Sequence, residues 1–287
     1  MGIFAENLSY TYMPGTVFEV RALSGISLSI GDKEFVAIMG HTGSGKSTLI
    51  QMMNGLLKPT DGRITVQGMC TSEKGVSLRE MRKKVGLVFQ YPEYQLFEET
   101  VGADVAFGPK NLGLGTETAQ EQARQAMQEV GLCYDEFKDR SPFELSGGQK
   151  RRVAMAGVLA MNPEVLILDE PTAGLDPRSR DETLGLLSAI HKERGCTVIM
   201  VSHNMDEIAK VAQRVLVLAE GRLMMDDAPS QVFSHAQELR AMNLGVPATV
   251  VLAEALRRRG ADVPDGLITV NAMHAWLRER GLARHAE

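Results

Sequence analysis

A glycine-rich stretch of the sequence has the residue types and spacing of a phosphate-binding loop. It matches the pattern GxxxxGK[ST] and is followed by Thr48. In such loops backbone amides surround phosphate oxygens, the lysine reaches the β- and γ-phosphates, and the final hydroxyl binds Mg²⁺. The apolar run before it predicts a buried parallel strand, and the residues after it predict a helix. We refer to this stretch as the phosphate loop: Gly40, His41, Thr42, Gly43, Ser44, Gly45, Lys46 and Ser47.

Two adjacent carboxylates follow another predicted buried strand at residues 165–168. Beside a phosphate loop, Asp169 is expected to hold Mg²⁺, directly or through water. Glu170 is expected to polarise an attacking water. The competing interpretation is that the two acids cap a helix after the strand.

A second helix start is also suited to an anion. Ser146 predicts an N-cap, Gly147 and Gly148 leave backbone amides exposed, and Gln149 continues the helix. The phosphate loop already surrounds one nucleotide. These residues, named the signature turn below, therefore most simply serve a nucleotide bound by a different subunit.

The pattern of apolar residues predicts how these motifs are positioned. Buried strands are expected at residues 35–39, 85–89, 165–168 and 197–201, alternating with helices, which indicates an α/β sheet. A mainly helical stretch at about 92–160 is expected as an insertion. We predict a domain at residues 1–227 and a small appended domain at 228–287. In the appended domain Thr269 is the expected N-cap of a helix that ends at Gly281, with Val270, Met273 and Leu277 on one face and Trp276 in the core.

Composition and charge exclude several classes of protein. Of 287 residues 44% are apolar and 23% are charged, an ordinary globular balance, and the net charge of -5 argues against a nucleic-acid partner. The cysteines, Cys70, Cys133 and Cys196, lack the spacing of a zinc site and are odd in number, which favours a reducing cytoplasm. We expect no signal peptide and no spanning helix, so any membrane association is peripheral.

Together these motifs resemble the ATP-binding cassette (ABC) ATPases over about residues 3–225. The resemblance implies a P-loop NTPase core with an N-terminal antiparallel β subdomain, an inserted helical subdomain and a small C-terminal α/β domain. It also implies ATP and Mg²⁺ as ligands and a head-to-tail dimer with a second cassette. Further site residues follow by position: Tyr12 stacks on adenine (Tyr10 is an alternative), Gln90 links Mg²⁺ to the membrane partner, Asp176 communicates across the dimer, and His203 contacts the γ-phosphate.

Residues 89–100 and 104–111, with 14–23, resemble the energy-coupling factor subgroup of these ATPases, in particular the second of its two ATPase types. That subgroup powers uptake of vitamins or of cobalt or nickel ions at the cytoplasmic side of the bacterial cell membrane. It implies a transmembrane coupling protein and a small membrane substrate-binding protein as partners, with Glu93, Glu98 and Asp104 as candidate contacts. The alternatives are another ABC importer class for amino acids or metal chelates, a cassette acting on DNA or ribosomes, and an inactive subunit.

Overall fold

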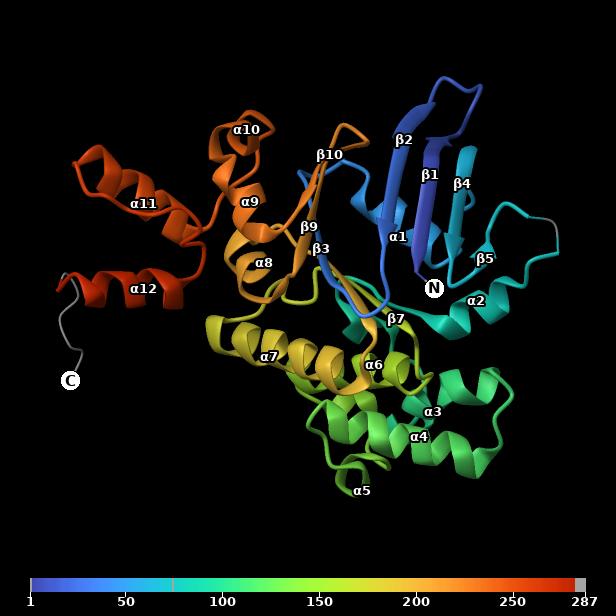
Figure 1. Ribbon diagram of the computed structural model, residues 1–287. Helices are drawn as coiled ribbons and strands as arrows, with labels where there is room; N and C mark the ends of the chain where they lie inside the picture. The colour runs from blue at the N-terminus through green and yellow to red at the C-terminus, as the bar shows by residue number, and fades with distance from the viewer. Residues whose placement is uncertain (1, 74, 282–287) are drawn as a thin grey trace.

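The computed structural model describes residues 2–73 and 75–281, and Figure 1 shows their arrangement. One sheet is antiparallel and has the strand order β2-β1-β4-β5. Its strands are β1 (Ile3–Tyr12), β2 (Val20–Ile30), β4 (Asp61–Val66) and β5 (Met69–Cys70). The alternation of Ile26, Leu28 and Ile30 with serines places these apolar side chains in the core, as the sequence predicts.

The larger sheet has the order β10-β9-β3-β8-β7-β6 and is parallel except for the β9–β10 pair. Its strands are β3 (Phe35–Met39), β6 (Val85–Val88), β7 (Val165–Asp169), β8 (Thr197–Val201), β9 (Arg214–Ala219) and β10 (Arg222–Asp227). The predicted buried strands are confirmed. The β9–β10 pair was not predicted from the sequence, and it extends the sheet beyond β3.

Helices cover both faces of the larger sheet. Helix α1 (Lys46–Met53) shares one apolar cluster with the antiparallel sheet, and a second cluster joins the other face of β3 to the helices on that side. Figure 1 shows the helical insertion between β6 and β7 as a separate layer below the sheets. The remaining elements up to the last strand are α2 (Leu78–Lys84), η1 (Pro92–Gln95), α3 (Val101–Asn111), α4 (Thr116–Glu129), α5 (Tyr134–Phe137), η2 (Pro142–Glu144), α6 (Gly147–Leu159), α7 (Pro177–Arg194) and α8 (Met205–Val211).

The segment after β10 differs from the expected α/β composition. Its described residues form helices only: α9 (Pro229–Ser234), α10 (Ala236–Ala241), α11 (Ala248–Arg258) and α12 (Val270–Glu279). The Thr269 side chain accepts a hydrogen bond from Ala272 N and begins α12, as predicted. Met273 and Trp276 are buried, but Val270 is 69% exposed and does not share their apolar face.

The C-terminal segment packs in two separate parts, α9 with α10 and α11 with α12. Phe233 and Leu239, from α9 and α10, belong to the apolar cluster of the larger sheet. Ala253, Met273 and Trp276, from α11 and α12, form a separate small cluster, and Figure 1 shows these two helices beyond α9 and α10. The domain boundary at 228 stays a prediction. No helix in the described ranges has the length and apolar character needed to cross a bilayer.

Candidate active site

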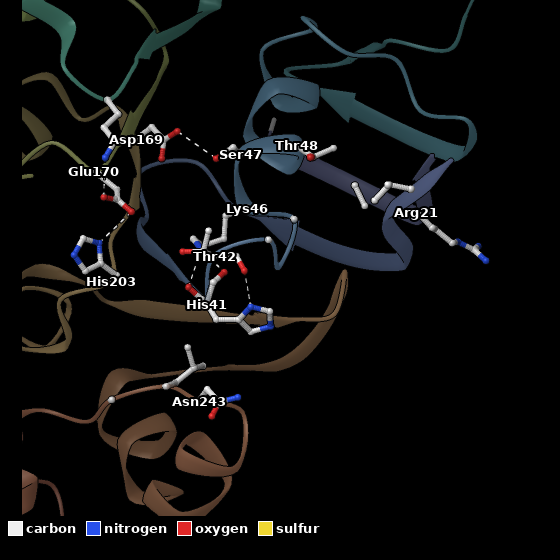
Figure 2. A pocket seen from close by; sticks show the side chains of 18 of the residues that line it. Arg21, His41, Thr42, Lys46, Ser47, Thr48, Asp169, Glu170, His203 and Asn243 are labelled. Atoms are coloured by element: carbon white, nitrogen blue, oxygen red, sulfur yellow. Dashed lines mark hydrogen bonds and ion pairs between the residues drawn. The ribbon is translucent and has the colours of Figure 1, made fainter. Parts of the chain in front are cut away.

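A cavity of about 820 Å³ lies where the loops after β3, β7 and β8 meet at one edge of the larger sheet (Figure 2). Parallel strands bring their carboxyl ends to the same edge, so residues far apart in the sequence meet there. The structure brings these predicted site residues to its wall: Tyr12, Gly40, His41, Thr42, Gly43, Gly45, Lys46, Ser47, Thr48, Gln90, Asp169, Glu170 and His203.

The phosphate loop joins β3 to α1 in a conformation that needs glycine. Gly45 has φ +100°, and a Cβ atom there would lie 2.6 Å from the carbonyl oxygen of Ala22. No side chain caps α1, so its first backbone amides are available to an anion in the cavity. Ser44 is the exception among the predicted binding residues in this loop: its side chain is fully buried and does not line the cavity.

Lys46 lies beneath the phosphate loop and is 9% exposed. Its Nζ donates to the carbonyl oxygens of Gly40 at 2.7 Å and His41 at 2.9 Å. Burial lowers the pKa of Lys46, and the nearby carboxylates of Glu170 and Asp169 act in the opposite direction. The ammonium group is thus held at the cavity by loop carbonyls that phosphate oxygens can replace as acceptors.

Asp169 ends β7 next to the start of α1. The Ser47 hydroxyl donates to Asp169 Oδ2 at 3.4 Å, which places a hydroxyl and a carboxylate side by side. Burial raises the pKa of Asp169, and the negative charge of Glu170 raises it further. This carboxylate therefore gains from a cation bound in front of it.

Glu170 has φ +48°, an uncommon conformation for a residue other than glycine. Its backbone N–H donates to Val201 O at 3.0 Å, which ties the end of β7 to β8. Gln90 Nε2 donates to Glu170 Oε2 at 3.2 Å, and His203 Nδ1 lies 3.1 Å from Glu170 Oε1. The turn at Glu170 directs its carboxylate into the cavity, and Figure 2 shows this carboxylate beside His203.

The structure distinguishes between the two tyrosines near the end of β1. Tyr12 lines the cavity, and its hydroxyl lies 3.2 Å from Thr48 Oγ1. Tyr10 packs against the core and makes a T-shaped contact with the Tyr12 ring, with ring centroids 4.7 Å apart. Tyr12 therefore is the tyrosine that a bound base can contact.

Several cavity residues were not predicted from the sequence. Three of them begin β2, one begins α8, and three lie in the loop after α10. Figure 2 shows Asn243 on the side of the cavity next to His41. The sequence carries no local signal for the last group, because the packing of α9 and α10 brings it here. The unpredicted residues are Val20, Arg21, Ala22, Met205, Asn243, Leu244 and Gly245.

The signature turn and Asp176 do not line this cavity. At the start of α6, Ser146 Oγ accepts from Gln149 N at 3.3 Å, and Gln149 Oε1 accepts from Ser146 N at 3.0 Å. A Cβ added to Gly147 or Gly148 would have no neighbour within 4 Å. Asp176 caps α7, because its carboxylate accepts from the backbone of Arg178 and Ser179.

Two of the candidate acidic contacts for a membrane partner are used inside the chain. The side chain of Glu93 pairs with buried Arg151 at 3.3 Å, and Arg151 also donates to the carbonyls of Pro171 and Ala173. Asp104 accepts from the backbone amides of Phe97 and Glu98, each at 3.0 Å. Both carboxylates therefore already stabilise the chain's own loops, and contact of Glu93, Glu98 and Asp104 with a partner stays a prediction.

Comparisons with known proteins agree with this geometry. The family model described as ABC transporter matches residues 23–173. The chain is 54% identical to the energy-coupling factor transporter ATP-binding protein EcfA2 of Clostridium tetani, over 94% of each chain.

Among solved structures, cbiO1 from Clostridium perfringens, described as part of the ABC transporter complex cbiONQ, is 41% identical with a TM-score of 0.73 and covers 88% of this chain and 98% of its own. The dimeric ATP-binding cassette MJ0796, in a post-hydrolysis state bound to ADP and Pi, is 30% identical with a TM-score of 0.70, over 79% and 98%. With the site geometry, these matches show that the chain belongs to the ABC transporter ATPases and, among them, to the energy-coupling factor transporter ATP-binding proteins.

Proposed function

We propose that this chain binds and hydrolyses ATP to power an energy-coupling factor importer of vitamins or transition-metal ions. The observation that carries the proposal is the meeting of Lys46, Asp169, Glu170 and His203 at one cavity. The names of the relatives support the transporter class. The alternative importers of amino acids or metal chelates lack comparable support.

The nucleotide site is proposed to be shared between two cassettes packed head to tail. The cavity of this chain has a phosphate loop, a carboxylate pair and Tyr12, while its signature turn faces open space elsewhere. A second cassette, identical or related, would bring its own signature turn to this cavity. ATP would then hold the dimer closed, because both cassettes gain contacts when the γ-phosphate is present.

The side chains at the cavity have separable roles in hydrolysis. Glu170 orients and polarises the attacking water, and Gln90 and His203 hold its carboxylate from either side. Lys46 offsets the charge on the phosphate oxygens. Tyr12 contacts the base, and the backbone amides of the phosphate loop and the start of α1 bind the phosphates.

The residues present also suit Mg²⁺. Ser47 and Asp169 offer adjacent oxygen atoms, and Gln90 lies at the same cavity. No cluster of three or more His, Cys, Asp and Glu placed to hold a metal occurs in the described part of the chain. This agrees with an ion bound by few protein ligands together with water and nucleotide phosphates. When bound, Mg²⁺ neutralises charge on the β- and γ-phosphates.

We propose that the chain lies on the cytoplasmic side of the membrane, where it binds a transmembrane coupling protein. A small membrane protein that binds the substrate completes the complex. The loop after β6 supports this contact, because it exposes Tyr94 (84% exposed) and Phe97 (58%). Phe143, in η2 before the signature turn, is also 67% exposed. We expect the coupling protein to bind these side chains.

The test is phosphate release by the native complex, isolated through a tag on this chain and placed in lipid vesicles. ATP turnover that depends on the membrane subunits would support the proposal. A complex that binds ATP but releases no phosphate would contradict it, and identification of amino-acid-importer subunits would favour the alternative.

A further inference from the structure

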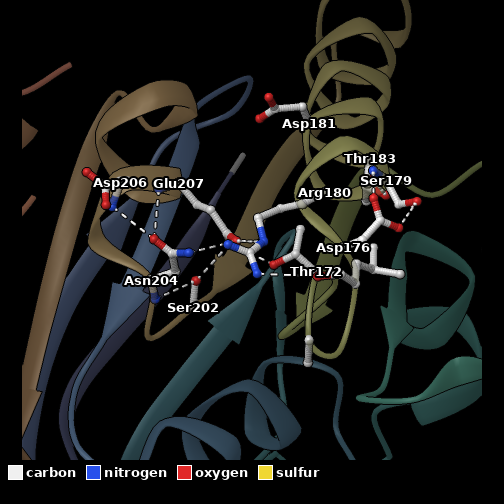
Figure 3. A network of polar contacts seen from close by, with 12 residues as sticks. Thr172, Asp176, Ser179, Arg180, Asp181, Thr183, Ser202, Asn204, Asp206 and Glu207 are labelled. Atoms are coloured by element: carbon white, nitrogen blue, oxygen red, sulfur yellow. Dashed lines mark hydrogen bonds and ion pairs between the residues drawn. The ribbon is translucent and has the colours of Figure 1, made fainter. Parts of the chain in front are cut away.

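A buried carboxylate behind the active site joins two loops and a helix. Glu207, on α8, is 4% exposed. Its Oε2 accepts from Thr172 Oγ1 at 2.7 Å and from Ser202 Oγ at 3.2 Å, and its Oε1 accepts from Asn204 Nδ2 at 3.1 Å. Arg180 Nε lies 3.2 Å from the same Oε1. Figure 3 shows Thr172, Arg180, Ser202 and Asn204 around the Glu207 carboxylate, from α7 and from the loops that precede α7 and α8.

The partners of Glu207 are next to the residues assigned to hydrolysis. Thr172 is the second residue after Glu170, and Ser202 and Asn204 flank His203. Arg180 lies in the first turns of α7, which Asp176 caps, and its Nη2 also donates to Leu175 O at 3.3 Å. One carboxylate thus connects the loop of Glu170, the loop of His203 and the helix that follows Asp176.

Apolar packing joins α7 to α8 through Leu184, Leu187 and Ile208, but the loops themselves border a cavity. A cavity of about 280 Å³ separates these loops, and Gln90, Glu170, His203, Arg180 and Glu207 all line it. Loops that border a cavity can move relative to one another unless polar contacts hold them. A buried charge is costly unless it is paired and hydrogen-bonded, so the partners of Glu207 are constrained to face it.

We propose that Glu207 is a positioning residue for ATP hydrolysis, which holds the loops of Glu170 and His203 in the relative position that the reaction requires. The proposal rests on the ATPase function above. Glu207 touches neither the nucleotide cavity nor the reacting atoms. It acts through Glu170, because Thr172 fixes the chain directly after that residue, and through Asn204, which fixes the chain directly after His203.

The test compares matched variants in the native complex. Glu207→Gln keeps the size of the side chain. Both oxygens of Glu207 accept hydrogen bonds, so in either orientation the NH₂ group of the glutamine would face a hydrogen-bond donor. Thr172→Val removes one hydroxyl donor and preserves shape. Asp181→Asn is the control: it removes the exposed Lys210–Asp181 ion pair, which joins the same two helices at 2.8 Å. We expect Glu207→Gln and Thr172→Val to lower kcat about 10- to 100-fold and to change the Kd for ATP less than about twofold. The control should retain wild-type values.

The decisive measurement is non-additivity with Glu170→Gln in single-turnover hydrolysis. If Glu207 acts through Glu170, adding Glu207→Gln to Glu170→Gln slows hydrolysis little further. Multiplied losses, or an equal loss of ATP affinity and of kcat, would show a general structural role and overturn the proposal. Wild-type kcat in Glu207→Gln would also overturn it. Absence of hydrolysis in the unaltered complex would instead contradict the proposed function itself.

Discussion

The carboxylate of Glu170 lies 3.1 Å from Nδ1 of His203, although 33 positions separate the two residues in the chain. Parallel pairing of β7 with β8 accounts for this proximity, because Asp169 pairs with Val201 and both strands end there. The hydrogen bond from Glu170 N to Val201 O continues the pairing for one more residue. The sheet register therefore brings these two residues to the same edge of the sheet.

Glu170→Gln is expected to retain ATP binding and to hydrolyse ATP at least about 100-fold more slowly, because an amide is a poor proton acceptor for water. The substitution preserves size and the contact with Gln90. Phosphate release measures the rate, and gel filtration with ATP should show the closed dimer accumulating. Turnover at the wild-type rate would remove Glu170 from the catalytic role.

Lys46→Ala is expected to weaken ATP binding about 10- to 100-fold, the range for hydrogen bonds that involve a charged group. The ammonium is already positioned at the cavity, so the loss falls on the nucleotide contacts. Titration calorimetry measures the Kd. Lys58→Ala, an exposed lysine that does not line the cavity, is the matched control. Equal affinities in the two variants would contradict the assignment.

Asp169→Asn should raise the melting temperature of the nucleotide-free protein at pH 7.5. The pKa of Asp169 is raised by burial and by Glu170, so the folded state binds its proton more tightly than the unfolded state does. Its favourable contribution is therefore present at acid pH and is lost as the pH rises through the folded pKa. The difference from wild type should shrink toward acid pH in thermal melts. A lower melting temperature for Asp169→Asn at pH 7.5 would refute this, and Mg²⁺–ATP should stabilise the variant less than wild type.

Gly148→Asp should leave ATP binding by the isolated chain unchanged and lower turnover of the complex about tenfold or more. A Cβ atom added at Gly148 has no neighbour within 4 Å, so the backbone has room for a side chain there, and the charge of that side chain opposes the phosphates of a nucleotide held by a second cassette. Gly115→Asp adds the same charge at the start of α4 and serves as control. If the isolated Gly148→Asp chain lost ATP affinity, the shared site would be disproved.

Glu93→Gln is expected to destabilise the protein by about 3 kcal/mol, because it leaves the Arg151 charge buried without its counter-charge. The exposed neighbour Glu99→Gln should cost less than about 0.5 kcal/mol. Thermal melting of Glu93→Gln, Glu99→Gln and wild type measures the loss of stability in each variant. Equal stability would show that the Glu93–Arg151 pair contributes nothing net.

Local patterns predicted the parts of the site that one segment builds alone. The phosphate loop needs only a strand, a glycine turn with Gly45 at positive φ, and a helix, and all three are present in consecutive residues. The run before Asp169 and the apolar run before His203 are continuous, as buried parallel strands require, so their common edge could be inferred.

Long-range packing determined what could not be predicted. Asn243 reaches the cavity because Phe233 and Leu239 dock their helices onto the core of the larger sheet, an interaction that no local pattern encodes. The pairing of Glu93 with Arg151 depends on the approach of η1 to α6 across 58 positions. A charged residue in a loop after a strand has the same sequence pattern whether it faces solvent or a buried arginine.

Helix α8 also connects the active site to the C-terminal segment. It begins two residues after His203, and its Asp206 accepts a hydrogen bond from Ala248 N, the first residue of α11, at 3.0 Å. Leu244 and Gly245, just before α11, line the nucleotide cavity beside Met205. A shift of the His203 loop would therefore act on the first turn of α11 through this hydrogen bond, which gives the appended helices a direct mechanical link to the cavity.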